Sequence, residues 1–147
     1  MSTLSRVTAA TICIASEVEV RSGQPLGRRL REFNYHFIGE YPESNTIWLN
    51  AKDADGVVIG GIRGFVVFHW LRVEFLWVEQ ASRRTGVGAE LLAEAEIQAR
   101  ELGAKNAGVE TFEWQAPEFY CKQGYTEATR LDDYVDGYYL AFMRKQL

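Results

Sequence analysis

The residues best suited to binding an anion lie between Leu76 and Leu92. An apolar run is followed by the basic turn Arg83-Arg84-Thr85-Gly86-Val87-Gly88 and then by a helix-like pattern. The first N–H groups of a helix lack backbone partners and carry a partial positive charge. Gly86 and Gly88 have no side chain to block an approaching anion, and the two arginines add full charges. The order predicts a diphosphate site, with a solvated basic turn as the alternative.

The elements around this turn are a strand before it, over 71–78, and a helix after it. The helix is predicted by an apolar stripe at helical spacing, formed by Leu91, Leu92, Ala95, Ala99 and Leu102. Gly103 ends the pattern, and Ala107–Thr111 resumes as a strand. A strand, a helix and a strand in this order predict a parallel crossover, which places the turn at the carboxyl end of a strand.

The remaining elements are predicted from periodicity and turn residues. Before the crossover we expect a strand over 10–15 and a helix over 24–38 that ends at Gly39. We also expect a hairpin whose two strands cover 46–52 and 57–68. Gly60-Gly61 inside the hairpin predicts a bulge or a close approach. After the crossover we expect a short helix over 117–122 and a hairpin over 125–131 and 138–144. The sequence therefore predicts an α+β domain on a mixed sheet.

Composition limits the class of protein. A chain of 147 residues is long enough for one core, so we expect a single domain over residues 1–147. A net charge of −4 argues against nucleic-acid binding. No apolar run could span a bilayer and no signal peptide is evident, which predicts a cytoplasmic protein without membrane partners. Cys13 and Cys121 are too few for a disulfide framework, and we predict no metal site.

Two blocks of the sequence, in order and separated by one strand, match the motifs of one family. The first runs from Leu76 through Gly88 into the following helix, and the second is Ala116-Pro117-Glu118-Phe119-Tyr120-Cys121-Lys122-Gln123-Gly124-Tyr125. With them the chain resembles the GNAT superfamily of acyl-CoA-dependent N-acetyltransferases over most of its length. It departs from the family at three positions. Arg84 stands where the family often has a glycine, Glu79 stands where a proline is common, and Glu113 stands where an asparagine is frequent.

The resemblance implies a mixed, mostly antiparallel sheet flanked by helices, with a splayed central strand pair that holds acetyl-CoA as cosubstrate. Free backbone groups at 76–78 would bind the pantetheine arm, and the turn would bind the diphosphate. The implied cofactor-binding residues are Leu76, Trp77, Val78, Arg83, Arg84, Thr85, Gly86, Val87, Gly88 and Ala89. The resemblance also implies a possible homodimer.

The resemblance assigns Tyr120 as the acid that protonates the leaving thiolate, since a phenol carries its proton at neutral pH. A buried tyrosine that only packs its ring is the alternative. We expect a backbone N–H near Trp77 or Val78 to stabilise the oxyanion.

Glu74 is the candidate general base, because strand alternation places it on one face with Leu76 and Val78. An exposed or paired glutamate beside Arg72 is the alternative, and His36 and His69 could also accept a proton.

The predicted acceptor is a primary amine of a small molecule or peptide. Its site would be lined by aromatic and acidic residues that suit a cation, among them Phe33, Tyr35, Phe37, Glu40, Tyr41, Trp114, Asp132, Asp133, Tyr134 and Tyr138, although most aromatic residues belong to cores. A non-catalytic acyl-CoA sensor is the second hypothesis. The chain lacks the longer fingerprint of a Rossmann domain and the Gly-Lys-Ser/Thr of a Walker site.

Overall fold

A computed structural model describes residues 10–23, 25–40 and 44–147. The chain forms two compact units, residues 1–41 and 42–147. The prediction of one domain over residues 1–147 stays a prediction.

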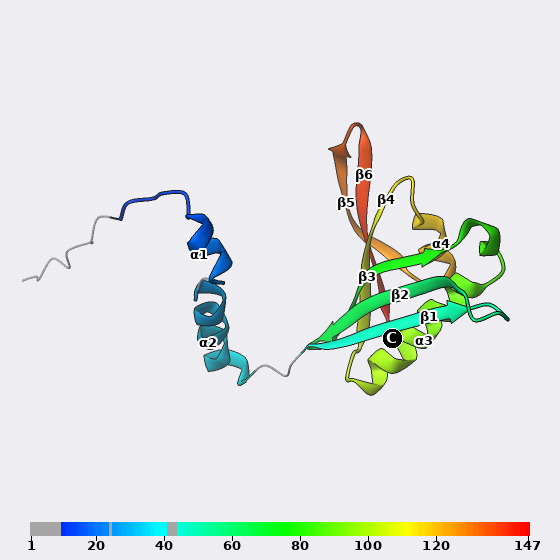
Figure 1. Ribbon diagram of the computed structural model, residues 1–147, viewed down its shortest axis with the longest axis horizontal. Helices are drawn as coiled ribbons and strands as arrows, with labels where there is room; N and C mark the ends of the chain where they lie inside the picture. The colour runs from blue at the N-terminus through cyan, green and yellow to red at the C-terminus, as the bar shows by residue number, and fades with distance from the viewer. Residues whose placement is uncertain (1–9, 24, 41–43) are drawn as a thin grey trace, which may run out of the picture. The chain divides into compact units, whose positions relative to one another are not determined.

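The N-terminal unit contains two helices, α1 (Glu17–Arg21) and α2 (Leu26–Ile38) (Figure 1). Ser16 caps α1, since its hydroxyl accepts a hydrogen bond from the N–H of Glu19 while the Glu19 carboxylate accepts from the Ser16 N–H. Gly39 ends α2 with a φ of 75°, as predicted. The strand predicted at 10–15 is wrong, because these residues form no ladder. β-branched residues favour a strand only where a neighbouring strand pairs with them.

The C-terminal unit is built on a six-stranded mixed sheet, and the predicted α+β class is confirmed. The strands are β1 (Asn45–Lys52), β2 (Val58–Val67), β3 (Trp70–Val78), β4 (Asn106–Phe112), β5 (Thr126–Val135) and β6 (Tyr138–Gln146). They lie in the order β1-β2-β3-β4-β6-β5, and β3 and β4 are parallel while the other neighbours are antiparallel. The parallel pair is joined by a helix, as the predicted crossover requires.

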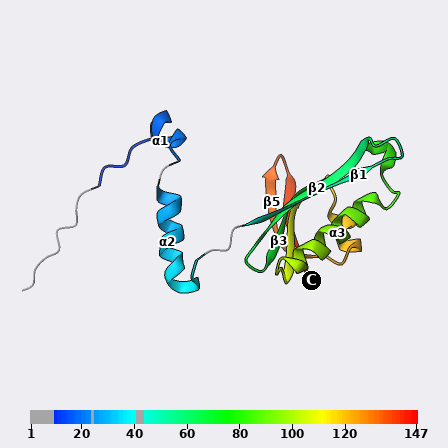
Figure 2. The same ribbon diagram turned by 60° about the horizontal axis from the view of Figure 1, so that its bottom comes forward.

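Helix α3 (Val87–Glu101) lies against one face of the sheet over β1, β2 and β3 (Figure 2). Four of the five residues of its predicted stripe are buried, whereas Leu102 is 41% exposed at the end of the helix. The short helices η1 (Gln80–Ser82) and α4 (Pro117–Lys122) flank the cleft described below. The core between α3 and the sheet is apolar, with Ile62, Leu71, Leu92 and Met143 among its most buried members.

Gly60 and Gly61 in β2 lie where neighbouring strands approach closely, which was one of the two predicted alternatives. A Cβ on Gly60 would lie 2.9 Å from the Trp77 carbonyl oxygen, and one on Gly61 would lie 3.0 Å from the Leu49 carbonyl oxygen. Both strands that flank β2 therefore press on its backbone at this point.

A buried carboxylate connects α3 to β6. Glu96 is 4% exposed, and its two oxygens lie 3.1 and 2.8 Å from the Lys145 ammonium nitrogen. The Tyr125 hydroxyl donates a third hydrogen bond to Glu96 at 3.0 Å, and burial together with the Glu96 charge raises the pKa of Tyr125. A fully partnered carboxylate in a core is tolerated, whereas an unpaired one is costly.

We expect Lys145→Met to lower the free energy of unfolding by about 3 kcal/mol, because it leaves the Glu96 charge buried without its cation. Denaturant unfolding would measure the loss. Lys52→Met, which alters an exposed lysine on β1, should change stability little, and Glu96→Leu combined with Lys145→Met should recover much of the loss. Equal stability of Lys145→Met and the unaltered protein would show that the pair contributes nothing.

Candidate active site

A cleft of about 1400 Å³ opens where β3 and β4 separate. The parallel ladder between them runs from Trp70 and Asn106 to Val73 and Val109, and no later pair forms, although β3 continues to Val78. On its other side β3 stays paired with β2 to its last residue. One edge of β3 thus faces open space, which confirms the predicted splayed pair.

A bulge at Glu74 accompanies the separation. The ladder with β2 passes from the pair Arg63 and Phe75 to the pair Gly64 and Val73, so Glu74 has no partner residue. A bulge bends its strand and interrupts the alternation of side chains. Residues Leu76 and Val78 pack against the core, whereas the Glu74 carboxylate lies 2.8 Å from the Nε of Arg63. The prediction that Glu74 shares a face with Leu76 and Val78 is therefore wrong, although Glu74 does line the cleft.

The backbone direction of β3 decides which of its groups face the cleft. The Trp77 carbonyl lies against Gly60 of β2, and the next N–H toward β2 is that of Glu79, which donates to Ile59. The N–H and C=O of one residue point to the same side of a strand, and successive residues alternate. The backbone groups of Leu76 and Val78 therefore face the cleft. Of the two predicted oxyanion donors, the Trp77 N–H therefore points toward β2, while the Val78 N–H faces the cleft, as the Leu76 N–H also does.

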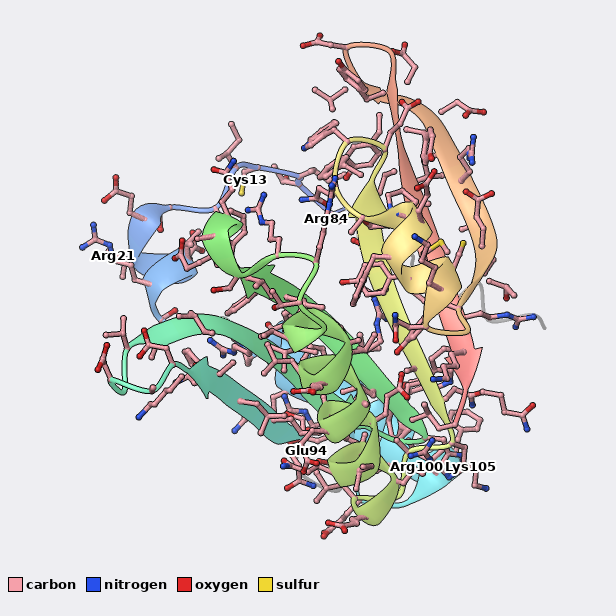
Figure 3. All side chains as sticks on the ribbon, turned by 90° about the vertical axis from the view of Figure 1, so that its right-hand side faces the viewer. Cys13, Arg21, Arg84, Glu94, Arg100 and Lys105 are labelled. Carbon is pink, nitrogen blue, oxygen red and sulfur yellow. The ribbon has the colours of Figure 1, made fainter. Side chains whose placement is uncertain are left out.

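The basic turn lies at one end of the cleft and leads into α3. Gly86 is the N-cap of α3 with a φ of 92°, and its carbonyl accepts the first helical hydrogen bond, from Glu90. Arg84 also has a positive φ, of 62°. Figure 3 shows Arg84 near the beginning of α3 and Arg100 near its end. The free N–H groups of the first helical turn and the Arg84 charge thus meet at the same place.

The structure brings most of the predicted turn residues to the cleft. Its lining includes Arg83, Arg84, Gly86, Gly88 and Ala89. The other two support the turn instead: the Thr85 hydroxyl donates to the Ser82 carbonyl, and Val87 packs against the core.

Arg83 is held on β3. Its Nε donates to the Val78 carbonyl at 2.9 Å, and its guanidinium lies 4.6 Å from the centre of the Trp77 ring. These contacts fix the turn against the open edge of the strand. They also place a positive charge within the lining of the cleft.

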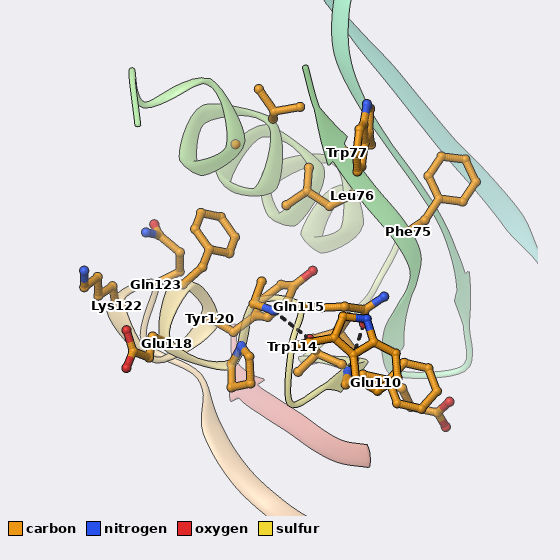
Figure 4. A pocket seen from close by; sticks show the side chains of 18 of the residues that line it. Phe75, Leu76, Trp77, Glu110, Trp114, Gln115, Glu118, Tyr120, Lys122 and Gln123 are labelled. Carbon is orange, nitrogen blue, oxygen red and sulfur yellow. Dashed lines mark hydrogen bonds between the residues drawn. The ribbon is translucent and has the colours of Figure 1, made fainter. Parts of the chain in front are cut away.

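Tyr120 lies on α4, across the cleft from β3. Figure 4 shows it below Leu76 and Trp77 in the same pocket. Tyr120 is 5% exposed, its ring packs between Phe119 and Tyr125, and its hydroxyl donates no hydrogen bond to any described residue. Burial raises the pKa of Tyr120 to about 12, so the phenol keeps its proton at neutral pH. This is a property that a proton donor needs.

Helix α4 packs beside the start of α3. Pro117 occupies the first turn of α4, and the Phe119 ring lies 3.5 Å from where a Cβ on Gly88 would be, which is an ordinary van der Waals distance. The two helices therefore meet beside the cleft at Gly88 and Phe119.

The far end of the cleft is aromatic and acidic. Phe112 and Trp114 stack with centroids 4.5 Å apart and an angle of 7°, and Tyr134 and Tyr138 of the β5–β6 hairpin pack on them. Among the acids that line this region are Glu110 and Glu113. The cleft thus has basic residues at the turn and acidic residues at the aromatic end.

Other predicted residues belong to other elements of the chain. His69 is in the turn that precedes β3, at the opposite end of that strand from Val78, and its carbonyl accepts from Lys105 and Asn106. His36 and the predicted acceptor residues Phe33, Tyr35 and Phe37 belong to α2 of the N-terminal unit, and Tyr41 lies outside the described residues.

Sequence reasoning missed the Arg63 pair with Glu74 and the role of Glu96. Glu96 did leave a signal, because it is an acidic residue four positions after Leu92 and three before Ala99, on the apolar face of α3.

The described residues contain neither a metal-binding cluster nor a membrane-spanning helix. Within residues 10–23, 25–40 and 44–147, no group of three or more His, Cys, Asp or Glu side chains is arranged to hold a metal ion. In the same part of the chain, no helix has the length and apolar character needed to span a membrane.

Comparison with known proteins identifies the family. Residues 15–125 match the family described as acetyltransferase (GNAT) family. The chain is 41% identical over 93 residues to blasticidin-S acetyltransferase of Streptomyces morookaense, covering 63% of this chain and 68% of the relative. It is 31% identical over 111 residues to acetyltransferase Atu2258 of Agrobacterium fabrum, and the match covers 74% of this chain and 81% of that relative.

A solved structure agrees with the sequence comparison. The crystal structure of an acetyltransferase from Bacillus cereus superposes with a TM-score of 0.84 at 29% identity, over 94% of this chain and 98% of that one. The predicted resemblance is confirmed: the chain belongs to the GNAT family of acetyltransferases and is an N-acetyltransferase with acetyl-CoA as its cosubstrate.

Proposed function

We propose that this enzyme transfers the acetyl group to a primary amine of a small molecule, by direct attack of the amine on the thioester. The observation that carries the proposal is the open edge of β3, which lies between the N-terminus of α3 and the buried phenol of Tyr120. One cleft thus offers an anion site, a strand edge and a proton donor.

The cosubstrate would lie along β3. The Val78 N–H and the Leu76 carbonyl face the cleft and suit the amides of the pantetheine arm, whereas the Val78 carbonyl already accepts a hydrogen bond from Arg83. The amides from Arg84 to Ala89 suit the diphosphate, and the Arg84 guanidinium adds a full charge. These features fit a phosphorylated thioester with an extended amide arm.

The transfer needs a hydrogen-bond donor for the carbonyl oxygen of the thioester and a proton donor for the leaving sulfur. The amine nitrogen forms a bond to the carbonyl carbon, and the negative charge that develops on oxygen is stabilised by the Leu76 N–H, which lies farther from the diphosphate turn than the Val78 N–H. The carbon–sulfur bond then breaks, and the thiolate takes the proton of the Tyr120 hydroxyl. The nitrogen loses its proton to a base, and Tyr120 is reprotonated from water.

We propose Glu74 as that base, acting directly or through water. Its ion pair with Arg63 is made through Oε2, so the proton would be accepted at Oε1. The side chain is 40% exposed and lines the cleft, which gives a water molecule access to it.

Glu74→Gln should lower kcat at neutral pH by about 10-fold or more, because an amide cannot accept the proton. The loss should shrink at alkaline pH, where the amine is already deprotonated. Glu127→Gln is the matched control, since Glu127 also pairs with an arginine but lies on β5 outside the cleft lining. An equal deficit at every pH would assign Glu74 a structural role through Arg63.

The acceptor panel follows from the relatives and from the acidic end of the cleft. It would include blasticidin S, because the similar enzyme of Streptomyces morookaense is named for it, together with polyamines, aminoglycosides and N-terminal peptides. Calorimetry with acetyl-CoA, followed by an assay of thiol release, tests the proposal. Release that requires a small-molecule amine supports it, and binding without release from any amine supports the sensor alternative. The possible homodimer and the cytoplasmic location stay predictions.

A further inference from the structure

We propose that the acceptor carries a second, flat cationic group such as a guanidinium, and that Glu113, Trp114 and Tyr134 bind it. This inference rests on the proposed function, since it concerns the acceptor end of the same cleft. It names a group of the acceptor that does not react but determines which amines are bound.

The first observation is a set of exposed aromatic rings within the cleft lining. Trp114 is 53% exposed and Tyr134 is 55% exposed, and both line the cleft. They come from the turn after β4 and from β5, and Phe112 lies between them, in ring contact with each. Large exposed aromatic surface that gathers in a cleft indicates a ligand site.

The second observation is that the backbone around these rings is fixed. The Phe112 N–H donates to the Gln115 side-chain oxygen at 2.8 Å, and the Gln115 N–H donates back to the Phe112 carbonyl at 2.9 Å. The Glu113 N–H donates to the Tyr139 carbonyl at 3.1 Å, which ties the turn to β6. The aromatic wall is therefore preorganised, so little ordering cost falls on binding.

The third observation is an uncompensated acid beside the rings. Glu113 lies between Phe112 and Trp114 in the sequence, lines the cleft and has no ion-pair partner among the described residues. The neighbouring Glu110 lies 4.0 Å from Arg72. A free carboxylate next to aromatic faces suits a cation that can both pair with it and stack.

A flat cation satisfies this site better than an ammonium group does. A guanidinium stacks on aromatic rings and binds a carboxylate through two parallel hydrogen bonds, whereas an ammonium group is compact and strongly hydrated. The protein itself uses such stacking, with Arg130 3.7 Å from the Tyr139 ring centre, Arg83 over Trp77 and Arg63 over Trp48. The same chemistry is available to a ligand at Trp114.

The experiment measures amine binding to the CoA-saturated protein by calorimetry, so that it does not depend on turnover. Three probes share a four-carbon amine: agmatine adds a guanidinium, putrescine adds an ammonium and n-butylamine adds no second charge. We expect agmatine to bind about 10-fold more tightly than putrescine, and n-butylamine to bind least.

Two variants test whether agmatine binds at Glu113 and Trp114. Glu113→Gln and Trp114→Leu should each weaken agmatine binding by about 10-fold and leave n-butylamine binding unchanged. Leu131→Ala is the matched control, because Leu131 is 51% exposed on the same hairpin as Tyr134 but lies outside the cleft lining. It should leave agmatine binding unchanged.

Equal binding of agmatine and putrescine, absence of agmatine binding, or agmatine binding that is insensitive to Glu113→Gln would overturn the inference. None of these outcomes touches the proposed function, which depends on acetyl-CoA binding and on thiol release with the wider panel. Conversely, preferential binding of agmatine without thiol release from any amine would support the subsite and contradict the proposed transfer.

Discussion

Gly86→Asp should abolish detectable acetyl-CoA binding, with the dissociation constant raised about 100-fold or more. The substitution places a carboxylate at the N-cap of α3, where we propose that the free N–H groups and Arg84 bind the diphosphate. Two like charges brought together at a binding interface cost several kcal/mol. Calorimetric titration with acetyl-CoA measures the effect.

The chain offers a closely matched control in Gly103, at the other end of α3. Gly86 and Gly103 have φ values of 92° and 93°, and a Cβ on either would meet nothing within 4 Å. Gly103→Asp therefore introduces the same charge and the same backbone strain away from the cleft. If Gly103→Asp weakened acetyl-CoA binding as much as Gly86→Asp, the loss would come from helix destabilisation and the anion site would lie elsewhere.

Tyr120→Phe should lower kcat by about 100-fold and leave the dissociation constant of acetyl-CoA nearly unchanged. The substitution removes only the hydroxyl, and a positioned general acid typically contributes a factor of this size. The ring contacts with Phe119 and Tyr125 are retained, so the melting temperature should change little. Steady-state kinetics together with calorimetry separates the two quantities.

The pH dependence of the unaltered enzyme provides a second check on Tyr120. Burial raises the pKa of Tyr120 to about 12, so the phenol stays protonated through the neutral and mildly alkaline range. A loss of kcat between pH 7 and pH 9 that disappears in Tyr120→Phe would require a much lower pKa and would contradict this environment. Equal loss of kcat and of acetyl-CoA affinity in Tyr120→Phe would indicate that the residue acts through packing.

The parts of the site that the sequence predicts well are those with local signals. The basic turn before α3 carries Gly86 at the N-cap, where the backbone has a positive φ, and Gly88 in the lining of the cleft. The helix α4 begins at Pro117 and is followed by Gly124, with a φ of 91°. Each of these features depends on a few neighbouring residues, so it can be read without knowing the fold.

The parts that the sequence did not predict depend on partners far along the chain. The bulge at Glu74 exists because β2 pairs with β3 in a register that skips one residue, and it turned Glu74 toward Arg63. The ion pair between the buried Glu96 and the half-buried Lys145 joins residues 49 positions apart. The aromatic wall likewise forms only when the hairpin brings Tyr134 to Phe112. Periodicity within one segment contains no information about such pairings.

A crystal structure of the protein with bound coenzyme A would show directly whether the open edge of β3 holds the cosubstrate. We expect the pantetheine arm to pair with the Val78 N–H and the Leu76 carbonyl, and the diphosphate to lie at the N-terminus of α3 beside Arg84. We also expect the thiol to point toward the Tyr120 hydroxyl. Coenzyme A bound away from the cleft between β3 and β4, or bound there with its sulfur out of reach of Tyr120, would contradict these assignments.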